Sequence, residues 1–282
     1  MGFEFHVLPR RDGTPIQVPS TPSLKADPPA PFTAACCGTR IDGELQTIPG
    51  TDLRLWHWHY CACMAEAVGL ATERRRDAEA RAARHEAWQA RQRRLDALFQ
   101  WAQSLKVDDQ TFQTFRITPD NAGVVERIRQ WTERPGAEGF LLVGPVGCGK
   151  THLMRAIAHT LRARDVTVLY VSVPHLLERL RGPSAMEMTD VLKAFRQADV
   201  VIGDDVGAER PTEWTLDRLY LLVDARYEVE KPLVVTTNWR PDALAERLDD
   251  RIVSRLLGMS PTWELTGPDY RLMAAANRRN RA

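Results

Sequence analysis

The chain has 282 residues, of which 44% are hydrophobic, so it can bury a sizeable core in one large domain or two smaller ones. Its 38 basic and 37 acidic residues leave a net charge of +1, which excludes a basic field over the whole surface, so any contact with DNA needs a local patch. No apolar run reaches the roughly 18 residues of a membrane span, and residues 1–11 lack the apolar stretch of a secretory signal. These features predict a cytoplasmic protein with no membrane partner.

Residues 1–69 are rich in proline, cysteine and aromatic residues, and we interpret them as a separate module that binds a partner. Seven prolines between Pro9 and Pro31 exclude long regular elements there. Four of the five cysteines belong to this module: Cys36, Cys37, Cys61 and Cys63. In a reducing cytosol such a cluster favours metal binding over disulfides.

The cysteine cluster is a candidate zinc site. A structural zinc ion takes four thiolate or imidazole ligands, which usually come as two close pairs. Cys36 and Cys37 are adjacent instead of spaced by two residues, so the better candidates are Cys37, Cys61 and Cys63. The fourth ligand would be one of three nearby residues: Cys36, His57 or His59. The alternative is a loop-rich module with buried thiols and no metal.

Residues 70–110 predict a long charged linker helix. No proline occurs from Met64 to Leu105, and alanine, arginine, glutamate and glutamine dominate this stretch. Trp88, Leu95 and Phe99 recur at spacings of seven and four residues, which gives one narrow apolar stripe on a charged rod. The helix is therefore either a solvated linker or a rigid arm that presents the N-terminal module to a partner.

Residues 111–282 alternate between strand and helix patterns, which is typical of a parallel sheet covered on both faces. Apolar or β-branched runs predict four strands, over residues 140–143, 166–173, 200–202 and 233–235. Helical patterns follow the first and the third of these runs, over residues 151–164 and 214–229. The sequence therefore predicts one α/β domain in this part of the chain.

A glycine-rich turn that fits the pattern GxxxxGK[ST] follows the first strand of this domain. Its residues are Gly144, Pro145, Val146, Gly147, Cys148, Gly149, Lys150 and Thr151. Glycines allow consecutive backbone N–H groups to turn inward around phosphate oxygens, and the next helix adds its positive N-terminus. Lys150 is expected to reach the β- and γ-phosphates, and Thr151 to offer its hydroxyl to Mg²⁺. The turn therefore predicts a P-loop that binds ATP with Mg²⁺.

Polar side chains follow two other predicted strands. Asp204 and Asp205 come after residues 200–202, at the distance from the P-loop where a second magnesium anchor is expected. Asp204 would hold Mg²⁺ through water, and Asp205 would orient the water that attacks the γ-phosphate. Asn238 closes the next strand, where it can sense or position water beside the γ-phosphate. Ordinary turn chemistry is the alternative for Asn238, since asparagine favours strand ends.

Further motifs resemble the AAA+ helicase loaders of the DnaC/DnaI type and their relatives, the IstB transposition ATPases. The resemblance covers about residues 111–271 and includes several ordered motifs: Gly203–Arg210, Thr212–Trp214, Leu219–Tyr220, Asp224–Tyr227, Thr236–Asn238 and Arg251–Leu256. Residues Phe112–Phe115 with Pro119–Asn121 are similar to the segment that leads into the ATPase domain of this family. The number and order of these motifs make the resemblance specific at the level of the family.

The resemblance implies an AAA+ P-loop core with a five-stranded parallel sheet in the order 5-1-4-3-2 and no C-terminal lid domain. It implies that Asn238 is the residue called sensor 1 and that Arg271 stands at the position of sensor 2. It also implies an arginine finger that completes the site of a neighbouring subunit. Arg255 is the preferred finger and Arg251 the alternative, because arginines four residues apart share one helix face and one of them could simply anchor the helix.

The sequence departs from the family pattern at two positions of the acidic strand. Gly203 stands where a bulky apolar residue usually precedes the acids. Asp205 replaces the glutamate of most AAA+ enzymes, although the loaders often carry aspartate there. A shorter carboxylate predicts slow hydrolysis, which would suit a switch better than a motor.

The resemblance implies two alternative functions. In the first, the N-terminal module binds a hexameric DnaB-type replicative helicase, and the ATPase core self-associates on ATP and holds single-stranded DNA. In the second, an IstB-like transposition ATPase binds duplex DNA and a transposase. The cysteine cluster and the long helix favour the loader, and the arginine-finger motif with the sensor asparagine argues against a small-molecule kinase. Candidate DNA contacts are four basic residues that could equally form a solvated face: Arg179, Arg181, Lys193 and Arg196.

Overall fold

The computed structural model describes residues 5–19, 32–34, 37–41, 43–47, 54–58, 60–100, 110–181 and 187–273. The chain divides into two compact units, Met1–Arg84 and His85–Ala282. The boundary between these units falls inside the long helix, so both units share it. A separate linker region over residues 70–110 stays a prediction.

The described part of the N-terminal unit contains three short antiparallel strand pairs. β1 (Phe5–Pro9) pairs with β2 (Pro15–Pro19), β3 (Phe32–Thr33) with β4 (Arg40–Ile41), and β5 (Gly43–Thr47) with β6 (Arg54–Trp58). Its buried side chains form one small cluster: Ile16, Val18, Ala34, Ile41, Cys61, Met64 and Ala67. The proline-rich sequence therefore folds into two-stranded ribbons, which can bury little apolar surface on their own.

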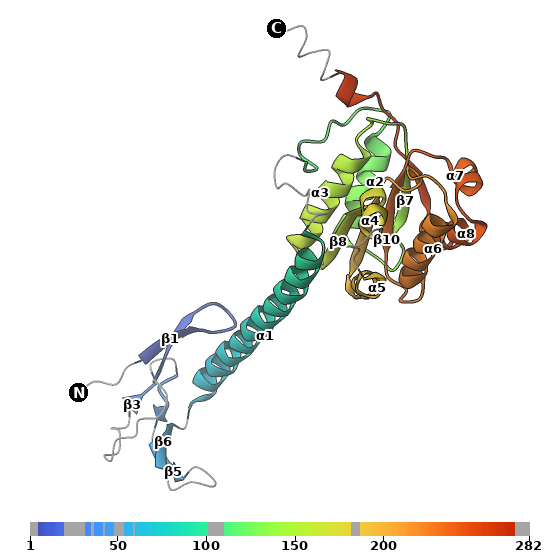
Figure 1. The fold of residues 1–282 in the computed structure, drawn as a ribbon. Coiled ribbons are helices and arrows are strands. Elements are labelled where there is room, and N and C mark those ends of the chain that lie inside the picture. Colours follow the sequence, from blue (N-terminus) through green and yellow to red (C-terminus); the bar gives the residue numbers. More distant parts are fainter. Residues whose placement is uncertain are drawn as a thin grey trace, which may run out of the picture. The chain divides into compact units, whose positions relative to one another are not determined.

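Helix α1 (Ala62–Leu98) is the predicted long helix and spans 37 residues (Figure 1). Most of its side chains are exposed, but Leu95 and Phe99, the residue just after the helix, are 5% and 2% exposed because they pack in the core of the second unit. The Gln92 side chain accepts a hydrogen bond from the Val168 backbone N–H at 2.9 Å and donates one to the Val168 carbonyl at 3.1 Å. The end of the helix is therefore anchored to the second unit and is more than a solvated linker. Among the described residues, no helix is long and apolar enough to cross a membrane.

The second unit is built on a five-stranded sheet in which all neighbouring strands are parallel. The spatial order is β11 (Thr262–Glu264), β7 (Phe140–Val143), β10 (Leu233–Thr237), β9 (Val200–Asp204) and β8 (Val168–Ser172). Counted along the chain within this sheet, the order is 5-1-4-3-2, as the resemblance implied. The four strands predicted from the sequence are all present, and the fifth is β11.

Helices cover both faces of this sheet. They are α2 (Ala122–Glu133), α3 (Lys150–Arg162), α4 (Val173–Arg179), α5 (Met188–Gln197), α6 (Glu213–Tyr227), α7 (Pro241–Arg247) and α8 (Asp250–Met259). One apolar cluster joins the sheet to α2 and α3, and the other joins it to α4, α5, α6 and α8. The central strands β7, β9 and β10 are buried at every position, which is why they read as continuous apolar runs in the sequence.

A buried arginine holds the far end of this sheet together. Arg226 of α6 is 0% exposed, and its guanidinium donates to four backbone carbonyls. The acceptors are Phe195, Ala198, Asp199 and Pro232, which lie between the end of α5 and the starts of β9 and β10. Burial lowers the pKa of Arg226 to about 10, and the charge of Asp199 opposes that shift. The guanidinium therefore remains charged at neutral pH and satisfies carbonyls that the helix end leaves free.

The unusual glycine of β9 is explained by its neighbours. A Cβ on Gly203 would lie 3.3 Å from Cγ2 of Val173, so the Val173 side chain occupies the space that a larger side chain at position 203 would need. An apolar cavity of about 30 Å³ remains next to Gly203 and is lined by side chains of α5, α6, α8 and the sheet. This departure from the family pattern thus lies in the core and outside the nucleotide pocket.

Candidate functional site

The predicted P-loop connects β7 to α3 and has the backbone that its glycines require. Gly147 and Gly149 have φ angles of +80° and +104°, a region that side chains with a Cβ rarely adopt. A Cβ on Gly147 would lie 2.1 Å from the Asp269 carboxylate, and one on Gly149 would lie 2.7 Å from the Phe115 ring. A Cβ on Gly144 would lie 2.4 Å from the Leu265 carbonyl oxygen. The loop can therefore form this cradle only with glycine at these three positions.

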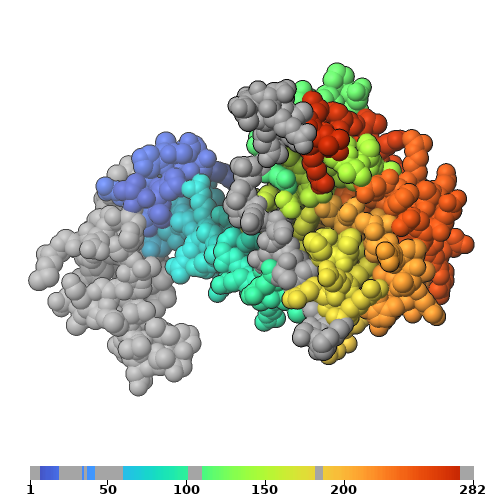
Figure 2. Space-filling view, turned by 45° about the horizontal axis from the view of Figure 1, so that its top comes forward, coloured from blue at the N-terminus to red at the C-terminus, as the bar shows by residue number. Residues whose placement is uncertain are grey.

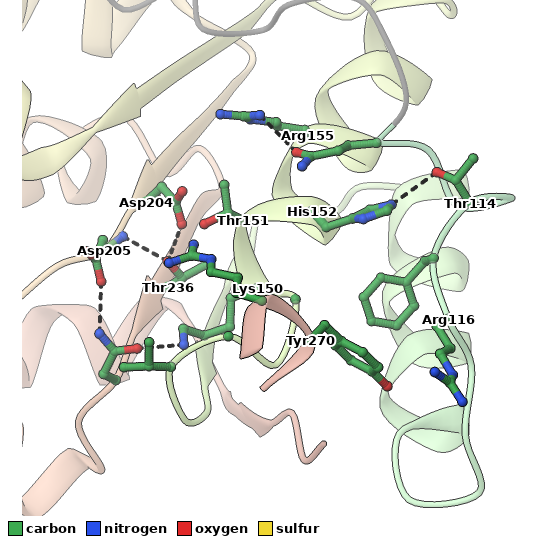
Figure 3. A pocket seen from close by; sticks show the side chains of 17 residues that line it. Thr114, Arg116, Lys150, Thr151, His152, Arg155, Asp204, Asp205, Thr236 and Tyr270 are labelled. Atoms are coloured by element: carbon green, nitrogen blue, oxygen red, sulfur yellow. Dashed lines mark hydrogen bonds between the residues drawn. The ribbon is translucent and has the colours of Figure 1, made fainter. Parts of the chain in front are cut away.

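The P-loop opens into a pocket of about 470 Å³, a size within the range of small-molecule sites (Figure 3). The predicted site residues that line it are Val146, Gly147, Gly149, Lys150, Thr151, Asp204, Asp205, Asn238 and Arg271. Gly144, Pro145 and Cys148 complete the loop behind this lining, and Cys148 is fully buried. The structure thus brings all the residues predicted for the ATP site of a single chain to one place.

Lys150 is held inside the pocket by three acceptors. Its Nζ donates to the carbonyl oxygens of Gly144 and Pro145 at 2.8 Å and to Oδ1 of Asn238 at 2.6 Å. Burial lowers the pKa of Lys150, Arg271 lowers it further, and the carboxylates of Asp204 and Asp205 oppose these shifts. A cation in this position can turn from its carbonyl partners to an anionic ligand in the same pocket.

The two acids at the end of β9 have different surroundings. Asp205 has a φ angle of +67°, its N–H donates to Oγ1 of Thr236 at 2.8 Å, and its Oδ1 accepts from Nδ2 of Asn238 at 3.0 Å. Asp204 is 5% exposed, and its Oδ1 accepts from the Thr236 hydroxyl at 2.5 Å. Aspartate tolerates the left-handed region better than glutamate, which gives a physical reason for the shorter acid at position 205. Lys150, Asn238 and Asp205 thereby form one continuous hydrogen-bonded chain.

The oxygen atoms of this pocket fit a magnesium ion. Thr151 offers a hydroxyl from the first turn of α3, and Asp204 offers a carboxylate from the end of β9 (Figure 3). Hydroxyl and carboxylate oxygens are hard donors of the kind that Mg²⁺ takes beside phosphate oxygens and water. Thr151 and Asp204 are therefore the residues that could hold the metal.

The segment before α2 forms a wall of the pocket that the sequence did not predict as a site. Nε2 of His152 is 2.9 Å from the Thr111 carbonyl oxygen and 3.3 Å from Oγ1 of Thr114, and its ring meets Phe115 edge-on at 5.2 Å. The remaining lining residues of this wall and its surroundings are Gln110, Arg116, Arg155 and Tyr270. The resemblance marked this segment as part of the domain, but a single sequence carries no signal that the segment folds over the P-loop helix.

The C-terminal residues close the pocket from another side. The Tyr270 N–H donates to the Gly147 carbonyl at 3.1 Å, which ties this segment to the P-loop. The Arg116 guanidinium lies 5.9 Å from the centre of the Tyr270 ring (Figure 3). Figure 2 shows the last described residues, in red, beside green parts of the ATPase unit. Arg271 lines the pocket, and its role as sensor 2 stays a prediction.

The two candidate finger arginines lie on α8 and are absent from the lining of the pocket in the same chain. Arg255 pairs with Asp224 at 2.8 Å, lies 4.7 Å from the centre of the Tyr220 ring, and has a side chain that is 29% exposed. Arg251 pairs with Asp249 at 2.8 Å and has a side chain that is 65% exposed. Arg255 anchors α8 to α6 through Asp224, and a finger role for either arginine at the site of another subunit stays a prediction.

Three of the predicted zinc ligands come together in the N-terminal unit. The sulfur atoms of Cys37, Cys61 and Cys63 all lie within 4.8 Å of one another. Cys61 is buried, and the Arg10 guanidinium lies 3.8 Å from Sγ of Cys63. Cysteine sulfur is a ligand that structural zinc takes, so these three residues could supply three of the four ligands of a zinc site. The remaining candidates, Cys36 and His59 and the side chain of His57, lie outside what the structure describes.

Two of the residues proposed for DNA, Arg196 and Arg181, make contacts inside the ATPase unit. Arg196 of α5 pairs with Glu228 at 2.8 Å, and the Arg181 guanidinium lies 4.5 Å from the centre of the Trp214 ring. Arg179 ends α4, and Lys193 is on α5. These contacts leave a DNA role for the four residues as a prediction.

The glycine cradle, the paired acids, the sensor asparagine and the strand order together define a P-loop ATPase of the AAA+ class. The family model of the bacterial DnaA ATPase domain matches residues 107–260, which are more than half of the chain. The chain therefore belongs to this family. An ATP-binding protein in an insertion sequence of Mycobacterium tuberculosis is 30% identical over 57% of this chain and 68% of its own length. The chain spans about a third of the DnaA proteins that it matches.

Solved structures show the same relationship. The crystal structure of DnaI matches with a TM-score of 0.50 and 26% identity over 56% of this chain and 89% of DnaI. The crystal structure of the DnaC helicase loader matches in fold, with a TM-score of 0.52 and 22% identity over 58% of this chain and all of that chain. The predicted resemblance to the DnaC/DnaI and IstB-like ATP-binding proteins is therefore confirmed.

Proposed function

We propose that the chain is an ATP-dependent loader that binds a hexameric DnaB-type replicative helicase through its N-terminal unit and single-stranded DNA through its ATPase unit. The observation that carries this proposal is the group of Cys37, Cys61 and Cys63, which forms a candidate zinc module ahead of the AAA+ core. A unit of this kind gives the chain a partner-binding part beside the ATPase. The relationship to DnaI and DnaC supports the same function.

In this proposal the ATPase site works as a switch. Lys150 leaves Asn238 and binds the β- and γ-phosphates, while Thr151 and Asp204 would hold a magnesium ion, which would neutralise phosphate charge. Asn238 keeps Asp205 oriented toward the attacking water. The loader holds its partner and DNA in the ATP state and releases them after hydrolysis. Arg271 contacts the nucleotide from the C-terminal side of the pocket.

Self-association on ATP completes this site. Arg255 and Arg251 lie outside the pocket of their own chain, which is consistent with a finger supplied by a neighbouring subunit. Several subunits aligned by ATP would also multiply weak contacts with single-stranded DNA, since each chain has a net charge of only +1.

The second candidate is an IstB-like transposition ATPase, which the insertion-sequence relative favours. Purified chain can be mixed with a non-hydrolysable ATP analogue and with single-stranded or duplex DNA of equal length, and then with a DnaB-type helicase. The loader proposal expects a preference for single strands and a complex with the helicase that Cys61→Ser with Cys63→Ser abolishes. A preference for duplex and no helicase complex would favour the transposition ATPase instead.

A further inference from the structure

A tyrosine of strand β8 contacts Asp204, the proposed carboxylate ligand of magnesium. The Tyr170 hydroxyl donates to Oδ2 of Asp204 at 2.9 Å, and Tyr170 is 6% exposed. In the parallel register of β8 and β9, Tyr170 lies beside Ile202 and Ser172 lies beside Asp204. Residues two apart share one face of a sheet, so the long tyrosine side chain reaches diagonally to the acid.

A second hydroxyl grips the same carboxylate from the other side. Thr236 of β10 donates to Oδ1 of Asp204 at 2.5 Å, and Figure 3 draws this bond as a dashed line between the two labelled side chains. β8 and β10 are the two neighbours of β9, so the carboxylate is held by one hydroxyl from each flanking strand. Each carboxylate oxygen can accept two hydrogen bonds or ligands, and one site on each oxygen is left for the pocket.

The donor strand is itself held in place. Gln92 bonds both the N–H and the carbonyl of Val168, and the Arg162 guanidinium donates to the same carbonyl at 3.1 Å. Val168 is two residues before Tyr170 on the outer strand of the sheet. These bonds occupy backbone groups that an edge strand would leave free, and they fix the position from which Tyr170 reaches Asp204.

We propose that Tyr170 is a positioning residue for magnesium, whose hydroxyl holds Asp204 in the orientation that binds the metal of Mg·ATP. The inference rests on the proposed ATP site. The phenol hydroxyl can donate to the carboxylate, and the buried Tyr170 side chain makes that hydrogen bond to Oδ2 of Asp204. Hydrogen bonds from residues behind a metal ligand set its orientation, and losing one commonly weakens metal binding.

The test uses Tyr170→Phe in the full chain, because phenylalanine keeps the buried ring and removes only the hydroxyl. Binding of a fluorescent non-hydrolysable ATP analogue is measured in EDTA and then across a Mg²⁺ titration. We expect unchanged affinity in EDTA and a Mg²⁺ requirement that rises roughly tenfold. Tyr227→Phe, which removes a hydroxyl from a 51% exposed tyrosine, is the matched control and should titrate like the unmodified chain.

The outcomes separate this inference from the proposed function. If the unmodified chain binds no nucleotide with or without Mg²⁺, the ATP site itself is wrong. If it needs Mg²⁺ and Tyr170→Phe needs the same amount or less, only the role of Tyr170 is overturned. Equal loss of affinity in EDTA and in Mg²⁺ would show a general packing role and would also overturn it. Thr236→Val tests the second hydroxyl, and an unchanged Mg²⁺ requirement there would contradict the two-sided grip on Asp204.

Discussion

In the ATPase unit the sheet lies between two large apolar clusters, whereas the described part of the N-terminal unit buries one cluster of seven residues, which includes Cys61 of the three-cysteine group. The first arrangement can be stable through apolar burial alone, since both faces of the sheet are covered. The second resembles small domains that need a metal or disulfides, because short strand pairs enclose too little apolar surface. We therefore predict that the ATPase unit is stable through apolar burial, whereas the N-terminal unit needs a bound metal.

The largest difference between the two units should appear when the zinc ligands are removed. Apparent binding free energies of structural zinc reach about 10–16 kcal/mol, so Cys61→Ser with Cys63→Ser should abolish zinc and the order of the N-terminal unit. ATP binding should remain, because the pocket lies wholly in the other unit. Metal analysis after purification without chelator checks this, with Cys148→Ser as the control that keeps zinc. A chain that contains no zinc under these conditions would contradict the comparison.

A neighbouring subunit should complete the ATPase site. Arg255→Ala should bind ATP normally. Its hydrolysis rate should fall by about 10³-fold or more if Arg255 acts as other arginine fingers do. Mixing it with Lys150→Ala should restore some activity, since each variant supplies what the other lacks at a shared interface. Asp224→Asn is the matched control, because it breaks the ion pair of Arg255 but keeps the arginine. If Asp224→Asn is equally inactive, or if Arg251→Ala alone shows the expected pattern, Arg255 is not the finger.

The buried Arg226 should contribute a large part of the stability of the ATPase unit without any metal. Arg226→Met would leave four backbone carbonyls without their donor, so the free energy of unfolding of the ATPase unit should fall by roughly 3–5 kcal/mol. Urea unfolding followed by circular dichroism measures the loss. Arg240→Met removes the exposed pair with Glu264 and should cost less than about 1 kcal/mol. Similar losses in both variants would contradict the role of Arg226.

The smallest expected loss of stability concerns Gln92, and it tests whether the end of α1 belongs to the ATPase unit. Gln92→Leu leaves the N–H and carbonyl of Val168 without their side-chain partner, so the ATPase unit should lose about 1–3 kcal/mol. The same substitution at the exposed Gln130 should cost much less. Equal stability of Gln92→Leu and the unmodified chain would show that the end of α1 does not belong to the ATPase unit.

The sequence predicted those parts of the site whose residues are adjacent in the chain. The P-loop is one run of eight residues, and glycine at its turns follows directly from its backbone. The α/β class and four strands were also predictable, because buried parallel strands produce continuous apolar runs. Contacts between distant residues could not be predicted. Gln92 and Val168 are 76 residues apart, and Tyr170 and Asp204 are 34 residues apart, so no spacing in a single sequence indicates either pair.

The N-terminal unit shows the same limit in another form. Cysteine spacing indicated Cys37, Cys61 and Cys63, and the structure brings these three together. The strand pairs around them were not predicted, since prolines at their ends read as breaks and each strand has five residues or fewer. Arg226 was missed for a related reason, because an arginine in a helix is usually exposed and only the folded chain shows its four acceptors.

Calorimetric titration of the chain with ATP and Mg²⁺ tests the central claim most directly. Lys150 is the cation that the P-loop holds ready for phosphate, so Lys150→Ala should reduce affinity at least about tenfold while the fold is kept. Lys231→Ala, which removes a surface lysine near Asp199, should bind as the unmodified chain does. Unchanged affinity of Lys150→Ala for Mg·ATP would contradict the assignment of this pocket as the ATP site.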